Sequence, residues 1–519
     1  MKRLFALVAF ATVALSAQAQ YQAQGVRFLS QIALNQFPGS PTIGSALYGY
    51  TSPSGREYAI IGVRNGESVV DITNPVLPVQ IGFINGPNSD WHENVTLGNY
   101  CYAVTDSGGA VGVRIIDLNN VDNGSASLVA TYNGGTQNPM AAVHTIQADP
   151  TTNRLFANGG NNTGVVILDA TNPTSLVRLG RWNTKYVHDC YVKNFTSGPY
   201  AGKQVIYAFC GSNGLYILDA TNPAAITVMG NTPLYGSGST YCHSGSLSPD
   251  AKYMMVNDEF DENGGNTTSC TTILINVENL SAPVRVGEFK SGVTTIDHNS
   301  QLRDGHLFLS AYEGGVRIYN AANPLGLFET GYFDTYPSGT ANSYNGNWGV
   351  FSHYASGNIA LSDRQRGLFV LDPSEAIGLG APIVSLESIG FQSGGIAEAR
   401  KSDDRYLVLG PVARTQGTGT FILQTTYSPT VSLDFTLEAR GSGTARAYLK
   451  NRATGQWDMM VAGILQPGVD RTLTITGVNA TNYVSTSGQV EARADIVTTP
   501  TGSRPLMSID MLQVKVNRT

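Results

Sequence analysis

The chain has 519 residues and a formal net charge of −6, and 13% of the residues are charged while 42% are hydrophobic. So few charged residues exclude a coiled coil, and so many hydrophobic ones exclude a chain that is mainly disordered. The slightly acidic balance gives no electrostatic basis for binding nucleic acid. Together with 58 glycines, this composition favours a large all-β protein.

The first residues have the three-part pattern of a secretory signal peptide. Lys2 and Arg3 precede an apolar run from Leu4 to Leu15, and Ala17-Gln18-Ala19 offers a cleavage site between small residues. A membrane anchor or a buried helix is the alternative, but the run is shorter than the roughly 20 residues that cross a bilayer. We therefore expect residues 1–19 to be removed and the mature protein to have no transmembrane segment. Its expected location is outside the cell or on the cell surface, with the periplasm as an alternative.

A module with a β-rich ending recurs seven times along the chain. Each ending is an apolar strand closed by a short polar residue, at Asp71, Asp117, Asp169, Asp219, Asn276, Asn320 and Asp372. Successive closing residues lie 44 to 57 residues apart. Asp or Asn at this point can accept a hydrogen bond from its own turn, and further apolar runs complete four short strands per module. Four-stranded units at this spacing predict a β-propeller.

The seventh module lacks a fourth strand after Leu371, but an apolar segment at the start of the chain can replace it. Residues 25–34 (GVRFLSQIAL) precede the first module and resemble the fourth strand of the others. We therefore predict that residues 20–375 form a seven-bladed β-propeller that this N-terminal strand closes. Closure gives every blade two neighbours and removes long exposed sheet edges.

The repeat ends after Asp372, and residues 376–395 are interpreted as a linker. From residue 396 to residue 519 the expected strands are longer. Leu433, Phe435 and Leu437 fall on one face of such a strand, as in a half-buried antiparallel sheet. This part is predicted to be a β-sandwich. Such modules on exported proteins often serve adhesion or targeting, which is an analogy at the level of the fold.

Six of the seven histidines lie where a new module begins. In a propeller this position opens the innermost strand of a blade, so we expect the six imidazoles to encircle one mouth of the central channel. Carboxylates of the same position and of neighbouring loops join them. The candidate metal ligands are His144, His188, Asp189, His243, Asp258, Asp297 and His298, and the candidate ligand-binding residues are His92, His353 and Asp363.

Three interpretations of these histidines are open. Each imidazole can be a structural group that links neighbouring blades through a backbone carbonyl. Alternatively, several imidazoles with Asp189, Asp258 or Asp297 bind an anionic ligand or a divalent metal, and this donor set suits zinc, iron, manganese or nickel. The rings can also act together as a pH switch, because protonation would accumulate positive charge. A divalent metal is the only cofactor that the sequence suggests.

An acidic loop of residues 258–263 has a partial similarity to a calcium-binding loop. Glu259, Asp261 and Asn263 offer oxygen ligands at alternate positions before a glycine. The twelfth position, where such a loop carries a carboxylate, is Cys270. A calcium loop is thus a further hypothesis for this segment.

The five cysteines leave at least one thiol unpaired within the chain. A disulfide between Cys242 and Cys270 would pin the acidic loop. Cys190 with Cys210 is the rival pairing.

The closing strands, such as SVVDITNP (68–75) and LYILDATNP (215–223), resemble LVIVD repeats. Longer stretches are similar to the choice-of-anchor B family of exported bacterial proteins: GREYAIIGVRNGESVVDITNP (55–75), CHSGSLSPDAKYMMVNDEFDE (242–262) and SGNIALSDRQRGLFVLD (356–372). The resemblance covers roughly residues 25–375. It implies an extracellular seven-bladed propeller and implies no particular reaction.

Two functions are compatible with these features. The first is an exported, non-enzymatic binding or surface-associated propeller, whose partner is an extracellular ligand, protein or glycan and whose C-terminal sandwich serves adhesion or targeting. The alternative is a metal-dependent extracellular hydrolase or lactonase-type propeller that uses the histidines and carboxylates of the channel mouth. The first is favoured because the residues that follow the histidines differ: Glu93, Thr145, Asp189, Ser244, Asn299 and Tyr354.

Overall fold

The chain divides into two compact units, one containing Phe28–Leu371 and the other containing Ala23–Arg27 and Asp372–Thr519. The computed structural model describes residues 21–136, 138–236, 238–339, 342–378, 383–389, 391–393, 399, 406–410, 416–425, 432–485, 488–497 and 506–517. The predicted signal peptide lies outside these described residues. Within them, no helix has the length and apolar character needed to cross a membrane.

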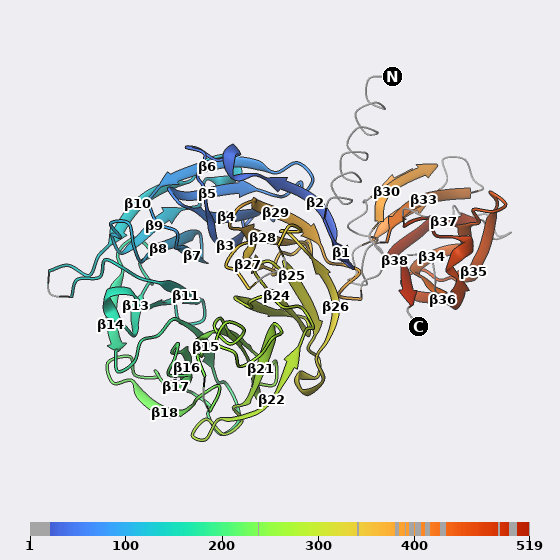
Figure 1. Ribbon diagram of the computed structural model, residues 1–519. Helices are drawn as coiled ribbons and strands as arrows, with labels where there is room; N and C mark the ends of the chain where they lie inside the picture. Colours follow the sequence, from blue (N-terminus) through green and yellow to red (C-terminus); the bar gives the residue numbers. More distant parts are fainter. Residues whose placement is uncertain are drawn as a thin grey trace. The chain divides into compact units, whose positions relative to one another are not determined.

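The first unit is a seven-bladed β-propeller, and the chain passes around its ring in sequence order (Figure 1). Blade one comprises β3 (Gly44–Thr51), β4 (Glu57–Val63), β5 (Gly66–Asp71) and β6 (Val79–Asn85), and blade two comprises β7 (His92–Leu97), β8 (Tyr100–Thr105), β9 (Val113–Asp117) and β10 (Ser127–Tyr132). Blade three comprises β11 (Thr145–Asp149), β12 (Arg154–Asn158), β13 (Val165–Asp169) and β14 (Val177–Trp182), and blade four comprises β15 (Asp189–Asn194), β16 (Gln204–Phe209), β17 (Leu215–Asp219) and β18 (Thr227–Thr232).

The remaining three blades follow the same order from the innermost strand outward. Blade five comprises β19 (Cys242–Leu247), β20 (Tyr253–Asp258), β21 (Thr271–Asn276) and β22 (Val284–Lys290), and blade six comprises β23 (Ser300–Arg303), β24 (His306–Ser310), β25 (Val316–Asn320) and β26 (Phe328–Phe333). Blade seven comprises β27 (Asn347–Phe351), β28 (Ile359–Asp363) and β29 (Gly367–Asp372), with β2 (Arg27–Ile32) as its outer strand. Short elements near these blades are β1 (Ala23–Gln24) and the 3-10 turns η1 (Leu34–Gln36), η2 (Val121–Asn123), η3 (Gly160–Asn162) and η4 (Pro324–Gly326).

The N-terminal strand closes the ring, as predicted. β2 pairs with β29, so blade seven combines the beginning of the propeller sequence with its end (Figure 1). The buried side chains of Leu29 and Ile32 pack in one hydrophobic cluster with Val70 of blade one and Val370 of blade seven. The strand therefore completes both a sheet and the core between two blades.

The turn that ends each third strand has the hydrogen bond that the repeat predicts. The Oδ1 atom of the closing Asp or Asn accepts a hydrogen bond from the backbone N–H two residues later in all seven blades, at 2.7–3.1 Å. This local bond stops the strand and directs the chain into the outer strand. The repeated residue type thus has a structural role in every blade.

The second unit is a two-layered β-sandwich built around one long strand, β34 (Ser432–Lys450). The first half of β34 pairs with β36 (Arg471–Asn479) and β38 (Leu506–Asn517), and its second half pairs with β35 (Trp457–Leu465) and β37 (Gln489–Val497). The strand changes layer near Gly441, where φ is +150° and an added Cβ would lie 1.9 Å from the carbonyl oxygen of Leu506. The other elements are β30 (Ile383–Ile389), β31 (Phe391–Ser393), β32 (Leu407–Gly410), β33 (Gln416–Gln424) and the 3-10 turn η6 (Ala480–Asn482).

The alternating pattern around Phe435 is confirmed, because Leu433, Phe435 and Leu437 are all fully buried in the core of the sandwich. The predicted linker of residues 376–395 differs from the structure. β30 and β31 lie within it and pair with β33 and β32, so they belong to the sheet rather than to a connection.

The predicted disulfides are absent, since all five cysteines, each in the described part of the chain, are buried free thiols. Cys242 lies on β19 and packs in the cluster between blades four and five, whereas Cys270 precedes β21 and packs in a cluster with residues of blade six. The two side chains are therefore in separate cores on either side of blade five. The rival pair, Cys190 and Cys210, is also unbonded, although both pack in one cluster.

Truncation of a side chain in the closing strand should test how much the ring depends on it. Leu29 is 6% exposed, and we expect Leu29→Ala to lower the free energy of unfolding by about 2–5 kcal/mol, because it leaves a cavity between two blades. Leu128→Ala is the matched control, since Leu128 is 46% exposed on β10, and its effect should stay within about 0.5 kcal/mol. Urea unfolding of both variants measures the difference. Equal effects of the two substitutions would contradict the closing role of β2.

Candidate functional site

One position at or next to the start of each innermost strand is equivalent in all seven blades. The backbone N–H groups of His144, His188 and His298 each donate to the carbonyl of the residue that ends the second strand of the same blade, at 2.7–2.9 Å. The strand register extends this equivalence to the remaining blades. We call it the ring position, and it is occupied by Ser45, His92, His144, His188, His243, His298 and Trp348.

Hydrogen bonds to the backbone link consecutive ring positions. The Nδ1 atom of His188 lies 3.2 Å from the carbonyl oxygen of His243, and the Nδ1 atom of His298 lies 2.6 Å from that of Trp348. Because a carbonyl oxygen only accepts, Nδ1 carries the proton in both rings. These bonds join neighbouring blades, as the structural interpretation of the histidines expects.

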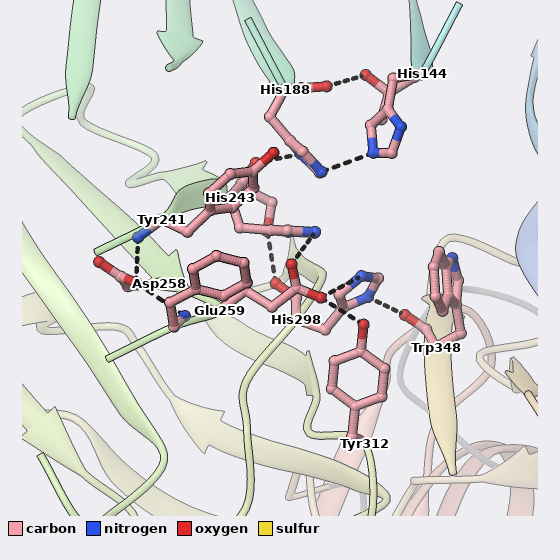
Figure 2. A network of polar contacts seen from close by, with 12 residues as sticks. His144, His188, Tyr241, His243, Asp258, Glu259, His298, Tyr312 and Trp348 are labelled. Atoms are coloured by element: carbon pink, nitrogen blue, oxygen red, sulfur yellow. Dashed lines mark hydrogen bonds and ion pairs between the residues drawn. The ribbon is translucent and has the colours of Figure 1, made fainter. Parts of the chain in front are cut away.

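Four imidazoles form a continuous arc at one end of the channel (Figure 2). The ring centroids are 4.3 Å apart between His144 and His188, 4.0 Å between His188 and His243, and 4.2 Å between His243 and His298. Glu259, from the turn after β20, reaches into the arc between His243 and His298 (Figure 2). Its two carboxylate oxygens lie 3.8 Å from the Nε2 atoms of these two rings.

The protonation of His298 leaves two acceptors facing each other. Since Nδ1 carries the proton, Nε2 presents its lone pair toward Oε1 of Glu259. Tyr312 donates to the same oxygen at 2.6 Å, so Glu259 is held in this position from the other side. A lone pair and an ionised carboxylate oxygen repel each other unless a proton or a metal cation lies between them.

Burial keeps the imidazoles of His188, His243 and His298 neutral near neutral pH. It lowers the pKa of His298 to about 3 and lowers the pKa of His188 and His243 well below the usual value, while the pKa of Glu259 is raised by burial. A positive charge from imidazolium is therefore not present at His243 or His298 near neutral pH. The ligand atoms of His243, Glu259 and His298 all lie within 4.8 Å of one another, and a tetrahedral metal site with bonds near 2.1 Å has ligand atoms roughly 3.4 Å apart.

His144 and His188 form a second polar pair beside this group. Their Nε2 atoms are 2.7 Å apart, and the Nδ1 atom of His144 lies 2.5 Å from a carboxylate oxygen of Asp106. Because Nδ1 of His188 carries its proton, its Nε2 accepts the hydrogen bond that Nε2 of His144 donates. This pair orients His188, whose ring packs against His243.

The arc opens into the central channel, a cavity of about 980 Å³. The residues that follow the ring position line its wall: Ala46, Glu93, Thr145, Asp189, Ser244, Asn299 and Gly349. Polar uncharged side chains continue along the strands, among them Asn94, Gln147, Ser300 and Gln301. Aromatic side chains of Trp91, Tyr186 and Phe260 also line the cavity. The channel therefore combines polar groups with aromatic faces.

His92 occupies the ring position but does not reach the channel. It is fully buried, with Nδ1 2.7 Å from a carboxylate oxygen of Glu67 and Nε2 2.9 Å from the carbonyl oxygen of Pro87. Arg114 also donates to Glu67. Burial opposes ionisation of Glu67, yet Arg114 and His92 lower its pKa overall. Both nitrogens of His92 are thus committed to a buried ionic network, and His92 is not placed to bind a ligand.

His353 and Asp363 also differ from the prediction. β27 begins at Asn347, so His353 follows the end of the innermost strand, and Trp348 holds the ring position of blade seven. The residue after the ring position is accordingly Gly349 and not Tyr354. Asp363 ends β28, and its Oδ1 accepts hydrogen bonds from the backbone of Gln365 and Arg366 at 2.8 Å. His353 lines the channel away from the imidazole arc, and Asp363 stabilises a turn.

Two further predicted ligands lie near the arc without joining it. Asp189 lines the channel, but its Oδ1 accepts hydrogen bonds from Thr145, Gln147 and the backbone of Cys190, and burial raises its pKa to about 6. Asp258 uses Oδ1 to accept from the backbone of Tyr241 and Phe260. Burial raises the pKa of Asp258 to about 7. Neither carboxylate belongs to the group formed by His243, Glu259 and His298.

The predicted calcium loop divides between two places. Glu259 turns toward the histidines, while Asp261 is fully buried in a separate group with Glu262 and Asp297. Asn263 is exposed. Asp297, predicted as a partner of the histidines, therefore lies in an all-carboxylate group instead. The prediction that Glu259, Asp261 and Asn263 bind one calcium ion together is therefore wrong.

Sequence reasoning missed the partnership of Glu259 with His243 and His298, and it missed the supporting roles of Tyr312 and Trp348. One signal was present, since carboxylates of neighbouring loops were expected to join the histidines. Asp106 and Glu259, from the connections between second and third strands, do so. The choice among the acidic residues of one turn depends on backbone geometry that a spacing pattern does not contain.

The comparisons with known proteins bear on the repeat and the fold. Residues 206–232 match the family model described as the LVIVD repeat. No curated protein matches the chain. The match covers most of β16 and all of β17 and β18, the outer three strands of blade four, so the chain contains at least one repeat of this kind.

Several solved structures are similar to the chain at low identity. One is the extracellular domain of a hybrid two-component system from B. thetaiotaomicron, with 12% identity and a TM-score of 0.43, covering 76% of this chain and 45% of that chain. Others are the periplasmic gluconolactonase of Pseudomonas aeruginosa (12% identity, TM-score 0.39, 53% and 80% covered) and U3-55K (10% identity, TM-score 0.43, 66% and 98% covered). The chain thus spans less than half of the first of these structures. At these values the likenesses carry no argument about function.

The acidity of Glu93 provides a test of the electrostatics of the channel wall. Burial raises the pKa of Glu93 to about 8, against the hydrogen bond that the indole N–H of Trp348 donates to it. A raised folded-state pKa gives stability that is present at low pH and is lost as the pH rises from about 5 to about 8. We expect Glu93→Gln to remove this part of the pH dependence. The urea midpoint of the variant should therefore rise relative to that of the wild type as the pH increases. Asp304→Asn is the control, because Asp304 is 87% exposed. A constant difference between Glu93→Gln and wild type from pH 5 to pH 8 would contradict the assignment.

Proposed function

We propose that this protein is an exported β-propeller that binds a divalent transition metal at the mouth of its channel through His243, Glu259 and His298. The metal would present an open coordination position to a small, oxygen-bearing ligand in the channel. The observation that carries the proposal is the lone pair of His298 Nε2 facing Oε1 of Glu259 at 3.8 Å. A cation between these atoms replaces their repulsion with two coordinate bonds.

The surroundings of the three residues support a metal site. Imidazole and carboxylate together suit zinc, iron, manganese or nickel, and three protein ligands leave a position for a further ligand. The Nδ1–H group of His298 donates a hydrogen bond to the carbonyl of Trp348, and the hydroxyl of Tyr312 donates one to Glu259. Such outer hydrogen bonds fix the tautomer and orientation of metal ligands.

We propose binding rather than catalysis as the function of the channel. The wall residues after the ring position differ from blade to blade, which suits recognition of one asymmetric ligand. Polar groups such as Asn94 and Gln147, and the faces of Trp91 and Phe260, suit a small polar molecule with an apolar face. The alternative, a metal-dependent hydrolase or lactonase, has no specific feature of the described site in its favour.

The finer assignments of family and location are part of this proposal. We place the chain in the choice-of-anchor B group of exported LVIVD propellers, on the residues quoted in the sequence analysis. Its partner is then an extracellular ligand, protein or glycan. The C-terminal sandwich is proposed to serve adhesion or targeting.

Metal titration tests the site directly. We expect metal-free wild-type protein to bind one Zn²⁺ per chain by isothermal titration calorimetry. His298→Ala and Glu259→Gln should weaken this affinity by more than roughly 100-fold, because loss of an outer hydrogen bond alone costs 10–100-fold. Tyr312→Phe should fall in that smaller range. Elemental analysis of the purified chain provides an independent measurement.

His306→Ala is the matched control, because His306 lies at the start of β24 and contacts the carbonyl of Asp304 rather than the arc. It should bind Zn²⁺ like the wild type. A wild-type chain that binds no Zn²⁺, or binds it equally well after His298→Ala, overturns the metal site. Metal-dependent turnover that is lost on His188→Ala or Asp189→Ala in a normally folded protein would replace the binding function with the enzymatic one.

A further inference from the structure

A second group of buried ligand-type side chains differs from the histidine arc in chemistry. Asp261, Glu262 and Asp297 are 0%, 6% and 0% exposed, and one carboxylate oxygen of each lies within 4.8 Å of the others. Asp261 and Glu262 belong to the turn after β20 of blade five, and Asp297 precedes β23 of blade six. The group therefore joins two neighbouring blades.

The hydrogen bonds of the protein satisfy only part of this group. Oδ2 of Asp261 accepts from the hydroxyl of Tyr235 at 2.7 Å, and Oδ2 of Asp297 accepts from Nδ2 of Asn257 at 2.9 Å. Oδ1 of Asp261, Oδ1 of Asp297 and both oxygens of Glu262 are buried and accept no hydrogen bond from an amide or hydroxyl group, and the carboxyls of Asp261 and Glu262 contact each other. A carboxylate buried in this way is costly unless something compensates it.

No positive side chain supplies that compensation. Among the ion pairs of the described residues, none includes Asp261, Glu262 or Asp297, and Arg285 and Arg317 pair with Glu288 and Glu329 instead. Three converging carboxyl groups thus lack a counter-charge from the described ion pairs. A bound cation would satisfy all of them at once.

We propose that Asp261, Glu262 and Asp297 bind a calcium ion between blades five and six. The donors are all oxygens, which selects a hard cation over a transition metal. Calcium takes six to eight oxygen ligands and accepts a bidentate carboxylate, and neither oxygen of Glu262 accepts a hydrogen bond from an amide or hydroxyl group. Magnesium demands a stricter octahedron at shorter distances, which a bidentate carboxylate suits less well.

This site differs from the calcium loop expected from the sequence. Glu259 and Asn263 are not among its ligands, while Glu262 and the distant Asp297 are. It is also separate from the proposed transition-metal site, which uses imidazole nitrogens. Either site can exist without the other, so each is tested by its own metal.

Calcium binding by the full chain is the test. After removal of metals with EGTA, we expect wild-type protein to bind one Ca²⁺ per chain by calorimetry and its melting temperature to rise with Ca²⁺ concentration. Glu262→Gln should weaken the affinity by on the order of tenfold or more, because carboxylate number tunes calcium affinity. Asp261→Asn is a second variant with the same expected loss.

Two controls separate this result from general effects of charge. Glu278→Gln removes a carboxylate that is 61% exposed in the same part of the chain, and it should keep the wild-type calcium response. Glu259→Gln should keep the calcium response while losing Zn²⁺ affinity. The proposal is overturned if wild-type protein binds no Ca²⁺ at millimolar concentration and its melting temperature is unchanged by EGTA. It is also overturned if Glu262→Gln and Asp261→Asn bind Ca²⁺ as tightly as the wild type.

Discussion

Closure of the ring brings the ring positions of neighbouring blades close enough for a side chain of one blade to reach the backbone of the next. The Nδ1 atoms of His188 and His298 use this proximity to donate to the carbonyls of His243 and Trp348. The acceptor is a main-chain group, so its position depends on the fold and not on the identity of the next residue. His188 and His298 are therefore each held in one tautomer, with Nε2 free to act as an acceptor.

Burial then determines the charge of the histidines that face Glu259. His243 and His298 are too well shielded from water to be protonated near neutral pH, so they cannot serve as counter-ions for Glu259. The arc differs in this respect from the Glu67 network, where Arg114 provides a permanent charge and His92 is closed off from the channel. His92 in blade two consequently differs in role from His243 and His298 in blades five and six. In blade two Arg114 supplies the positive charge beside Glu67, and in blades five and six we propose that a metal ion supplies it beside Glu259.

The repeat explains why the fold was largely predictable and why the site was only partly so. The spacing of the closing Asp and Asn residues predicts seven blades, and the unpaired final module predicts the closing strand. Both depend on local patterns that recur. The prediction for His353 is wrong because the sequence SHYASGN resembles the start of the other modules, whereas the pairing of Gly349 with Ser362 gives the equivalent position to Trp348. The disulfide and calcium-loop predictions failed for a related reason, since spacing does not reveal on which side of a blade a side chain lies.

The two carboxylate-containing groups are built from the same two short segments of the chain. Asp297 and His298 are adjacent in sequence but enter different groups, and Glu259 and Asp261 divide in the same way within one turn. Each of these two short segments therefore contributes to both groups at once. A cation that holds Asp261 and Asp297 together also restrains the backbone that carries Glu259 and His298. Any coupling between the two proposed ions is reciprocal, so each changes the affinity for the other by the same factor.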